Sequence, residues 1–216
     1  MNRYIRLAIL TVAFAHLGGN AAAAQVIGIN GGLSRASIAG NDADRAESIR
    51  GIKAGAAATF PLDGNFEFQV GAAFVEKGFK VGDHFSIGMD YIEVPVMLRI
   101  SVPVDGRISP HLAGGLGVGF NIGCRAATFF EGNPGNVDCE EIDFESKGVD
   151  WGFMANAGLS IATSDKLSVT FDVAYDTGRS SVVDDFGGVV EVFRGFDRPV
   201  TNRAWSFLMG VALPIK

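Results

Sequence analysis

The chain is poor in the residues that usually carry catalysis or bind metals and nucleic acids. Its 216 residues include only 2 cysteines and 3 histidines, and its 18 basic residues are outnumbered by 24 acidic ones. Two cysteines without a nearby histidine make a weak case for zinc. The acidic balance argues against nucleic acid as a partner. These absences leave a structural or surface role, without a cofactor or resident metal, as the starting hypothesis.

Histidine is also too sparse to indicate a catalytic site. Beyond the N-terminal segment the chain has only His84 and His111, and no recognisable motif surrounds either. The one enzymatic alternative pairs His84 with Ser86 or Ser180, in segments expected at the outer rim. We therefore predict that the protein is not an enzyme.

Long hydrophobic runs are absent after residue 24, although 48% of the chain is hydrophobic. No run reaches the roughly 18 residues of a transmembrane helix. Apolar residues instead alternate with small or polar ones, which is the period of a β-strand. Residues 91–102 show it most clearly. One face of this stretch carries Ile92, Val94, Val96, Leu98, Ile100 and Val102. The same alternation recurs over 25–34, 49–60, 65–76, 91–102, 107–122, 150–162, 166–177 and 203–215.

Residues 1–24 have the layout of a secretory signal peptide. Arg3 and Arg6 precede a short apolar stretch at 7–17, and Ala22-Ala23-Ala24 is a small-residue cleavage site. A retained membrane anchor is the alternative. The pattern predicts an exported protein with one remaining domain, residues 25–216. In an exported chain, Cys124 and Cys139 are expected to form a disulfide.

The connections between the predicted strands alternate between short and long. Pro61-Leu62-Asp63-Gly64, Pro103-Val104-Asp105-Gly106 and Thr163-Ser164-Asp165 are tight turns, and Asp-Gly is a hairpin signal. The long connections are expected at 35–48, 77–88, 125–149 and 178–202. Short turns on one rim and long loops on the other are typical of outer-membrane barrels. The prediction is an all-β, eight-stranded antiparallel up-and-down transmembrane β-barrel with short periplasmic turns and long extracellular loops.

The loop at 125–149 is strongly acidic. Carboxylates can bind Ca²⁺ or Mg²⁺, but these have no ordered ligand spacing, so a solvated loop is the simpler interpretation. The six acids are Glu131, Asp138, Glu140, Glu141, Asp143 and Glu145.

The composition of the two strand faces decides which face lies outside. A soluble, lipocalin-like barrel would need a richly polar outer face, whereas the polar face here is mostly glycine and alanine. Small residues suit the crowded interior of an eight-stranded barrel. The apolar face also carries aromatic residues near both ends, as a membrane barrel does. They are Phe60, Phe66 and Phe68 at the short-turn end and Trp151, Tyr175 and Trp205 at the other.

Charged residues on the small-residue face are then expected inside the barrel. Buried charges must pair or be hydrated, so Lys53 and Arg99 should each lie against one of the acids. We favour a packed network that fills the lumen over a channel. The predicted lumen network is Lys53, Glu67, Glu93, Arg99, His111 and Asp172. Pro95 removes one ladder donor within a closed barrel, so a bulge or local irregularity is expected there.

Three motifs resemble the PorT-like outer-membrane β-barrel domain family. They are Val-Gly-Ala-Ala-Phe-Val-Glu-Lys-Gly-Phe at 70–79, Tyr-Ile-Glu-Val-Pro-Val-Met-Leu at 91–98 and Gly-Gly-Leu-Gly at 114–117. The resemblance implies eight strands in the outer membrane and little about activity. The chain departs from the usual pattern by ending in Leu-Pro-Ile-Lys at 213–216, without a terminal aromatic residue.

The expected function is that of a small, monomeric, non-enzymatic protein of the bacterial outer membrane, with its extracellular loops as the interaction surface. Its expected partners are outer-membrane lipid, lipopolysaccharide and the outer-membrane assembly machinery. Two alternatives are a narrow porin-like channel for ions or small solutes and a soluble exported ligand-binding barrel.

Overall fold

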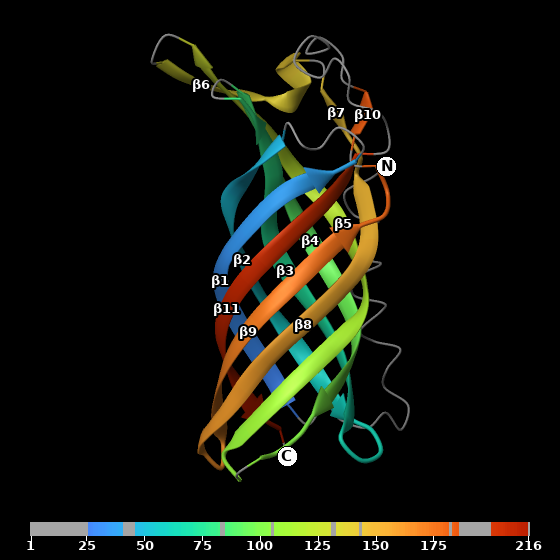
Figure 1. Ribbon diagram of the computed structural model, residues 1–216, viewed down its shortest axis with the longest axis vertical. Coiled ribbons are helices and arrows are strands. Elements are labelled where there is room, and N and C mark those ends of the chain that lie inside the picture. The colour runs from blue at the N-terminus through green and yellow to red at the C-terminus, as the bar shows by residue number, and fades with distance from the viewer. Residues whose placement is uncertain are drawn as a thin grey trace.

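A closed ring of eight antiparallel strands forms the body of the protein (Figure 1). The computed structural model describes residues 26–40, 46–82, 85–104, 106–130, 133–142, 144–181, 183–185 and 200–215. The predicted signal peptide at 1–24 and His84 lie outside these residues. The barrel strands are β1 (Val26–Ala39), β2 (Ala46–Pro61), β3 (Phe66–Val81), β4 (Phe85–Ser101), β5 (Ile108–Phe130), β8 (Val149–Ser164), β9 (Leu167–Gly178) and β11 (Thr201–Pro214).

Each strand pairs with its neighbours along the chain, and β1 pairs with β11 to close the ring. The register places Val26 opposite Pro214, so the first and last strands meet at the rim of the short turns. Two of the predicted turns lie between strands as expected, and Gly64 and Gly106 adopt there the positive φ angles, 65° and 52°, that favour glycine. The third turn is displaced to Asp165 and Lys166, because β8 continues to Ser164. The eight-stranded antiparallel barrel is confirmed.

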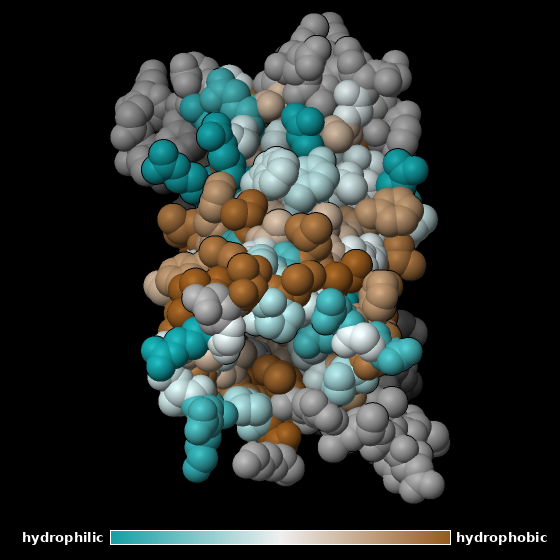
Figure 2. All heavy atoms as spheres, turned by 60° about the horizontal axis from the view of Figure 1, so that its bottom comes forward, coloured by the Kyte–Doolittle hydropathy of each residue, from teal (hydrophilic) through white to brown (hydrophobic). Residues whose placement is uncertain are grey.

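The apolar stripe of β4 lies on the outside of the barrel. Val96 and Leu98 are 43% and 49% exposed, and exposed apolar residues on the other strands continue the surface. Figure 2 shows hydrophobic residues gathered across the middle of the visible face, with hydrophilic ones above and below. A continuous apolar surface of this kind is unfavourable in water and favourable against lipid. We call this surface the apolar belt.

The strands extend beyond the belt on the long-loop side, where the prediction was wrong in detail. Residues 77–88, expected as a long loop, are mostly strand, because β3 continues to Val81 and β4 begins at Phe85. In this extension the apolar residues Phe79, Phe85 and Ile87 point inward and are buried. The alternation is therefore still period-2, but its apolar residues occupy the opposite face.

The loop between β5 and β8 is also structured. β5 continues as a hairpin with β6 (Asn133–Asp138), which projects beyond the barrel (Figure 1), and a 3₁₀ turn, η2 (Cys139–Ile142), follows. Two short strands, β7 (Glu145–Ser146) and β10 (Val183–Asp185), pair above the mouth. No helix in the described ranges is long and apolar enough to cross a membrane.

Pro95 interrupts the ladder locally without forming a bulge. The pairing of β4 with β3 is missing at Val94 and Pro95, which is the local irregularity expected there, but the register is the same on both sides. On its other side Pro95 pairs in register with Gly117 of β5, and the only register shift of β4 against β5 lies between Asp90 and Tyr91. That shift falls where the apolar belt ends and the inward-facing apolar residues begin.

Substituting Val96 with arginine tests the orientation of β4. A charged residue on the lipid face near mid-depth should destabilise the barrel by about 2–4 kcal/mol. Urea titration of the protein folded in lipid vesicles measures this loss. Val104→Arg is the matched control, because Val104 is 70% exposed in a short turn outside the belt. Equal effects of the two substitutions would contradict the assigned orientation.

Candidate functional site

The lumen is closed near the long-loop rim by a cluster of buried apolar side chains, here called the plug. Inward residues of four strands meet Phe144 and Val200, which come from the connections above the mouth. Most of these side chains are fully buried and pack against one another in an apolar layer. The plug consists of Ile38, Val75, Phe79, Phe85, Ile87, Met89, Tyr91, Ala126, Cys139, Phe144 and Val200.

A disulfide holds the top of the plug in place. Cys124 of β5 is bonded to Cys139 of η2, as predicted from the export signal, with 5.5 Å between their Cα atoms. The Phe144 amide then donates a hydrogen bond to the Cys139 carbonyl at 3.0 Å. The disulfide thereby ties the segment that carries Phe144 to the barrel wall.

A buried ion-pair network lies directly beneath the plug. Glu93 is placed between two lysines: its Oε2 lies 3.1 Å from Lys53 Nζ and its Oε1 lies 2.5 Å from Lys77 Nζ. Lys53 Nζ also contacts Asp176 Oδ2 at 2.7 Å. All four side chains are less than a tenth exposed. These charges are stable in the lumen only because each has an opposite charge within bonding distance.

Polar side chains connect this network to the plug. The Asn202 amide donates to the hydroxyl of Tyr91 at 3.2 Å and to Asp150 Oδ2 at 3.3 Å. Ser180 donates to the other Asp150 oxygen at 2.7 Å. Lys77 Nζ lies 5.7 Å from the centre of the Tyr91 ring, within the range of a cation–π contact. Tyr91 is therefore part of the plug and also contacts the ion-pair network beneath it.

A second polar cluster lies nearer the short-turn rim. Arg99 Nε is 3.2 Å from Glu67 Oε2, and its Nη2 donates to Ser160 at 3.2 Å. His111 Nε2 is 2.7 Å from Asp172 Oδ1. A side chain at position 158 would overlap both His111 and Asp172, so Gly158 makes the room for this pair.

The structure places all six residues of the predicted lumen network on the inward face. It joins Lys53 to Glu93 and Arg99 to Glu67, but His111 pairs with Asp172 in the second cluster. Sequence reasoning left out Lys77, Asp150 and Asp176. Asp150 and Asp176 occupy inward positions of predicted strands. Lys77 also faces inward, but it lies one residue beyond the predicted end of the strand at 65–76. Extending the alternation into the loops would have found Lys77.

A cavity of about 110 Å³ separates the upper network from the short-turn rim. Its lining includes Lys53, Arg99, Asp172, His111 and Asn156. His111 Nδ1 and Asn156 Oδ1 are buried without a protein hydrogen-bond partner. Polar atoms of this kind are commonly satisfied by internal water, and the cavity has room for it.

Within the described ranges, no group of three or more histidine, cysteine, aspartate or glutamate side chains could hold a metal ion. Of the six loop acids, Glu131 and Asp143 lie outside those ranges, as does His84 of the enzymatic alternative. Of its two candidate serines, Ser86 lies in β4 and Ser180 donates a hydrogen bond to Asp150. His111 is bonded to Asp172 and has no hydroxyl or thiol on its other ring nitrogen.

The sequence matches a known family over most of its length. Residues 21–182 fit the family described as "Outer membrane protein beta-barrel domain". The chain belongs to this family. Together with the outward apolar belt, this places the protein in the outer membrane and excludes the soluble ligand-binding barrel. The narrower PorT-like assignment stays a prediction.

Several solved structures are similar to the chain at low sequence identity. Neisserial surface protein A has 13% identity and a TM-score of 0.50, with 88% of this chain and 97% of that one covered. OprG from Pseudomonas aeruginosa has 13% identity and a TM-score of 0.48, with 89% and 97% covered. PagL, described as an outer membrane enzyme, has 13% identity and a TM-score of 0.46, with 87% and 99% covered. No curated protein sequence matches the chain.

Glu93→Gln tests whether the ion-pair network holds the barrel together. Removing the charge between Lys53 and Lys77 leaves buried cations undercompensated, which should lower the free energy of unfolding by about 3–5 kcal/mol. Urea titration in detergent micelles measures the change. Adding Lys77→Met to Glu93→Gln should recover part of it, because one unpaired charge is then removed.

Asp63→Asn is the control for this pair of variants. It removes an exposed carboxylate in a short turn, so it should change stability by less than about 0.5 kcal/mol. If Glu93→Gln were equally mild, the upper network would not be a determinant of stability.

Proposed function

We propose that the protein is a sealed, non-conducting barrel that presents its extracellular portion as an interaction surface of the outer membrane. The observation that carries this proposal is the double closure of the lumen. The apolar plug and the Lys53–Glu93–Lys77 network fill the lumen at two successive levels, with the plug on the extracellular side. A pore would require a continuous hydrated path, and both layers oppose one.

The proposed role is non-enzymatic. The one described histidine, His111, lies among the lower lumen residues, and no hydroxyl or thiol is hydrogen-bonded to its free ring nitrogen. Ser101, opposite His111 on β4, donates its hydrogen bond to Glu67 instead. The plug also separates it from the extracellular side. A substrate on the cell surface therefore has no route to the one histidine–carboxylate pair that the structure describes.

The extracellular portion is large enough for a binding role. Above the belt the wall continues, and the β5–β6 hairpin projects from it (Figure 1). The barrel strands form a closed ring, so the membrane part offers no free edge for pairing with a second copy. This supports a monomer in the membrane. The alternating apolar face of β11 suits recognition by the assembly machinery, which is part of the same proposal.

A narrow channel is the second candidate. The cavity in the lower lumen favours it, because the lining of that cavity includes charged and polar side chains, among them His111 and Asn156 with unpartnered atoms. Under the sealed-barrel proposal, this cavity is instead a water-filled recess closed on the extracellular side. The two functions differ in whether ions cross the upper network.

Planar-bilayer recording separates the two functions. The wild-type protein should show no single-channel events, while its heat-modifiable shift on gels demonstrates that it is folded. The double variant Cys124→Ser with Phe144→Ala should also be silent, because the upper ion-pair network still closes the lumen. Stable conductance that changes with Arg99→Ala would instead establish the channel.

A further inference from the structure

Four arginines lie side by side on the outer wall of the barrel, immediately beyond the apolar belt. Arg50 is on β2, Arg35 on β1 and Arg203 on β11, and Arg179 follows the end of β9. All four are exposed. β2, β1, β11 and β9 are consecutive neighbours in the ring, so the four charges form one row on adjacent strands.

The strand register brings these arginines close together. Arg35 is directly opposite Arg50. On its other side Arg35 is opposite Trp205, and Arg203 lies two residues farther along the same strand. Arg203 is opposite Thr177, and Arg179 lies two residues beyond it. Directly opposite and diagonal positions are the neighbours whose side chains interact on a sheet. Each arginine therefore has another arginine as a sheet neighbour.

This arrangement is unfavourable for folding by itself, because like charges directly opposite each other destabilise a sheet. No ion pair joins these four arginines to a carboxylate within the described ranges. Arg35 Nε donates a hydrogen bond to the Ser48 hydroxyl at 2.6 Å. The Cζ of Arg179 lies 5.5 Å from the ring centre of Phe153, as in a cation–π contact. Elsewhere on the same rim, Arg125 is paired with Asp90 at 2.9 Å. Among the described residues, the row thus has the charge of an anion site without a carboxylate that neutralises it.

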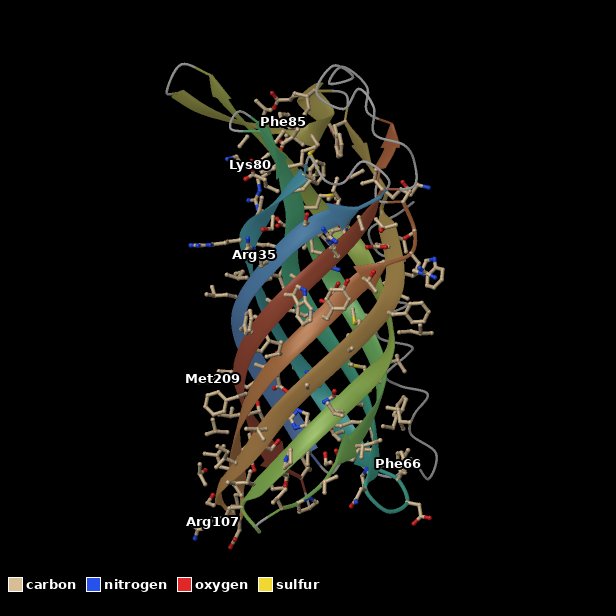
Figure 3. The ribbon with its side chains drawn as sticks, in the orientation of Figure 1. Arg35, Phe66, Lys80, Phe85, Arg107 and Met209 are labelled. Carbon is tan, nitrogen blue, oxygen red and sulfur yellow. A yellow bond between two sulfur atoms is a disulfide. The ribbon has the colours of Figure 1, made fainter. Side chains whose placement is uncertain are left out.

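The surface just below the row is strongly apolar. Leu33, two residues before Arg35, is 67% exposed, and Phe207, on β11 below Trp205, is 61% exposed. Figure 3 shows Arg35 projecting away from the barrel wall at a level above Met209, which also points outward. A molecule with anionic groups at the height of Arg35 and hydrocarbon beside Leu33 and Phe207 would match both parts of this surface.

We propose that the row of Arg50, Arg35, Arg203 and Arg179 binds the phosphate groups of an outer-leaflet lipid, with the acyl chains of that lipid against Leu33 and Phe207. Guanidinium groups bind phosphate oxygens in bidentate geometry and remain charged at any physiological pH. A bridging phosphate would also relieve the repulsion between Arg35 and Arg50. The inference rests on the proposed function only for the barrel's place in the membrane.

Binding of diphosphoryl lipid A to the full-length protein in detergent micelles tests the site. Native mass spectrometry of the wild type should detect a bound lipid. The triple variant Arg35→Gln, Arg50→Gln, Arg203→Gln should bind it about 100-fold more weakly, because three charge-assisted contacts are lost. Lipid A from which both phosphates have been removed should bind the wild type and the triple variant with the same low affinity.

The control is the double variant Arg107→Gln with Arg125→Gln. Arg107 lies at the opposite rim (Figure 3), and Arg125 already has Asp90 as a partner, so lipid affinity should change less than twofold. Without lipid, the triple variant should be at least as stable in urea as the wild type, because repulsion has been removed. A loss of binding caused by misfolding would instead lower that stability.

Three results would overturn the proposal. The first is equal binding of phosphorylated and dephosphorylated lipid A, which would indicate an apolar contact only. The second is wild-type affinity in the triple variant. The third is competition by millimolar inorganic phosphate as effective as that of the lipid, which would indicate a free-anion site. None of these depends on whether the lumen conducts, so failure of this proposal is distinguishable from failure of the sealed-barrel function.

Discussion

The rest of the structure depends on the ladder of backbone hydrogen bonds between β1 and β11. In hydrocarbon an unpaired backbone amide or carbonyl costs several kcal/mol, so a sheet can cross a membrane only when it has no edge. The fourteen Cα pairs from Val26–Pro214 to Ala39–Thr201 remove both edges at once. With closure at eight strands, the barrel has an interior only just wide enough for its own side chains. The crowded lumen is thus a consequence of the ring size.

That narrow interior explains why small and charged residues occur together inside. Gly158 leaves the space that His111 and Asp172 occupy, and Gly117 leaves space for the Met154 side chain. The remaining long side chains carry charge, and in a confined space each must meet its opposite. Glu93 meets this requirement by binding two lysines from different strands, β2 and β3. The pairs cross-link the barrel wall as they neutralise it.

Much of this architecture could be predicted from the sequence, because alternation in residues such as Val94 to Ile100 reports directly on a two-sided environment. The inward position of Glu93 and Arg99 followed from the same parity. The limits of prediction from alternation are also physical. Alternation gives the face of a residue but not the rotation of one strand against the next, so the partner of Lys53 could not be chosen among several acids.

The strand ends were missed for a different reason. Above Tyr91 the apolar residues point inward, so residues 77–82 and 85–88 present a polar outer face, which the sequence alone does not distinguish from a loop. Lys77 was lost from the predicted network with that segment.

The reversal at Tyr91 also determines how the protein sits relative to its surroundings. Below it, hydrophobic side chains point away from the barrel axis; above it, Met89, Ile87 and Phe85 point toward the axis. Sliding the barrel outward would expose Leu33 and Phe207 to water, and sliding it inward would bring Arg35 and Arg203 into hydrocarbon. The barrel therefore has one preferred immersion depth, and the point on β4 where the hydrophobic face changes sides marks the outer limit of the hydrocarbon that it fits.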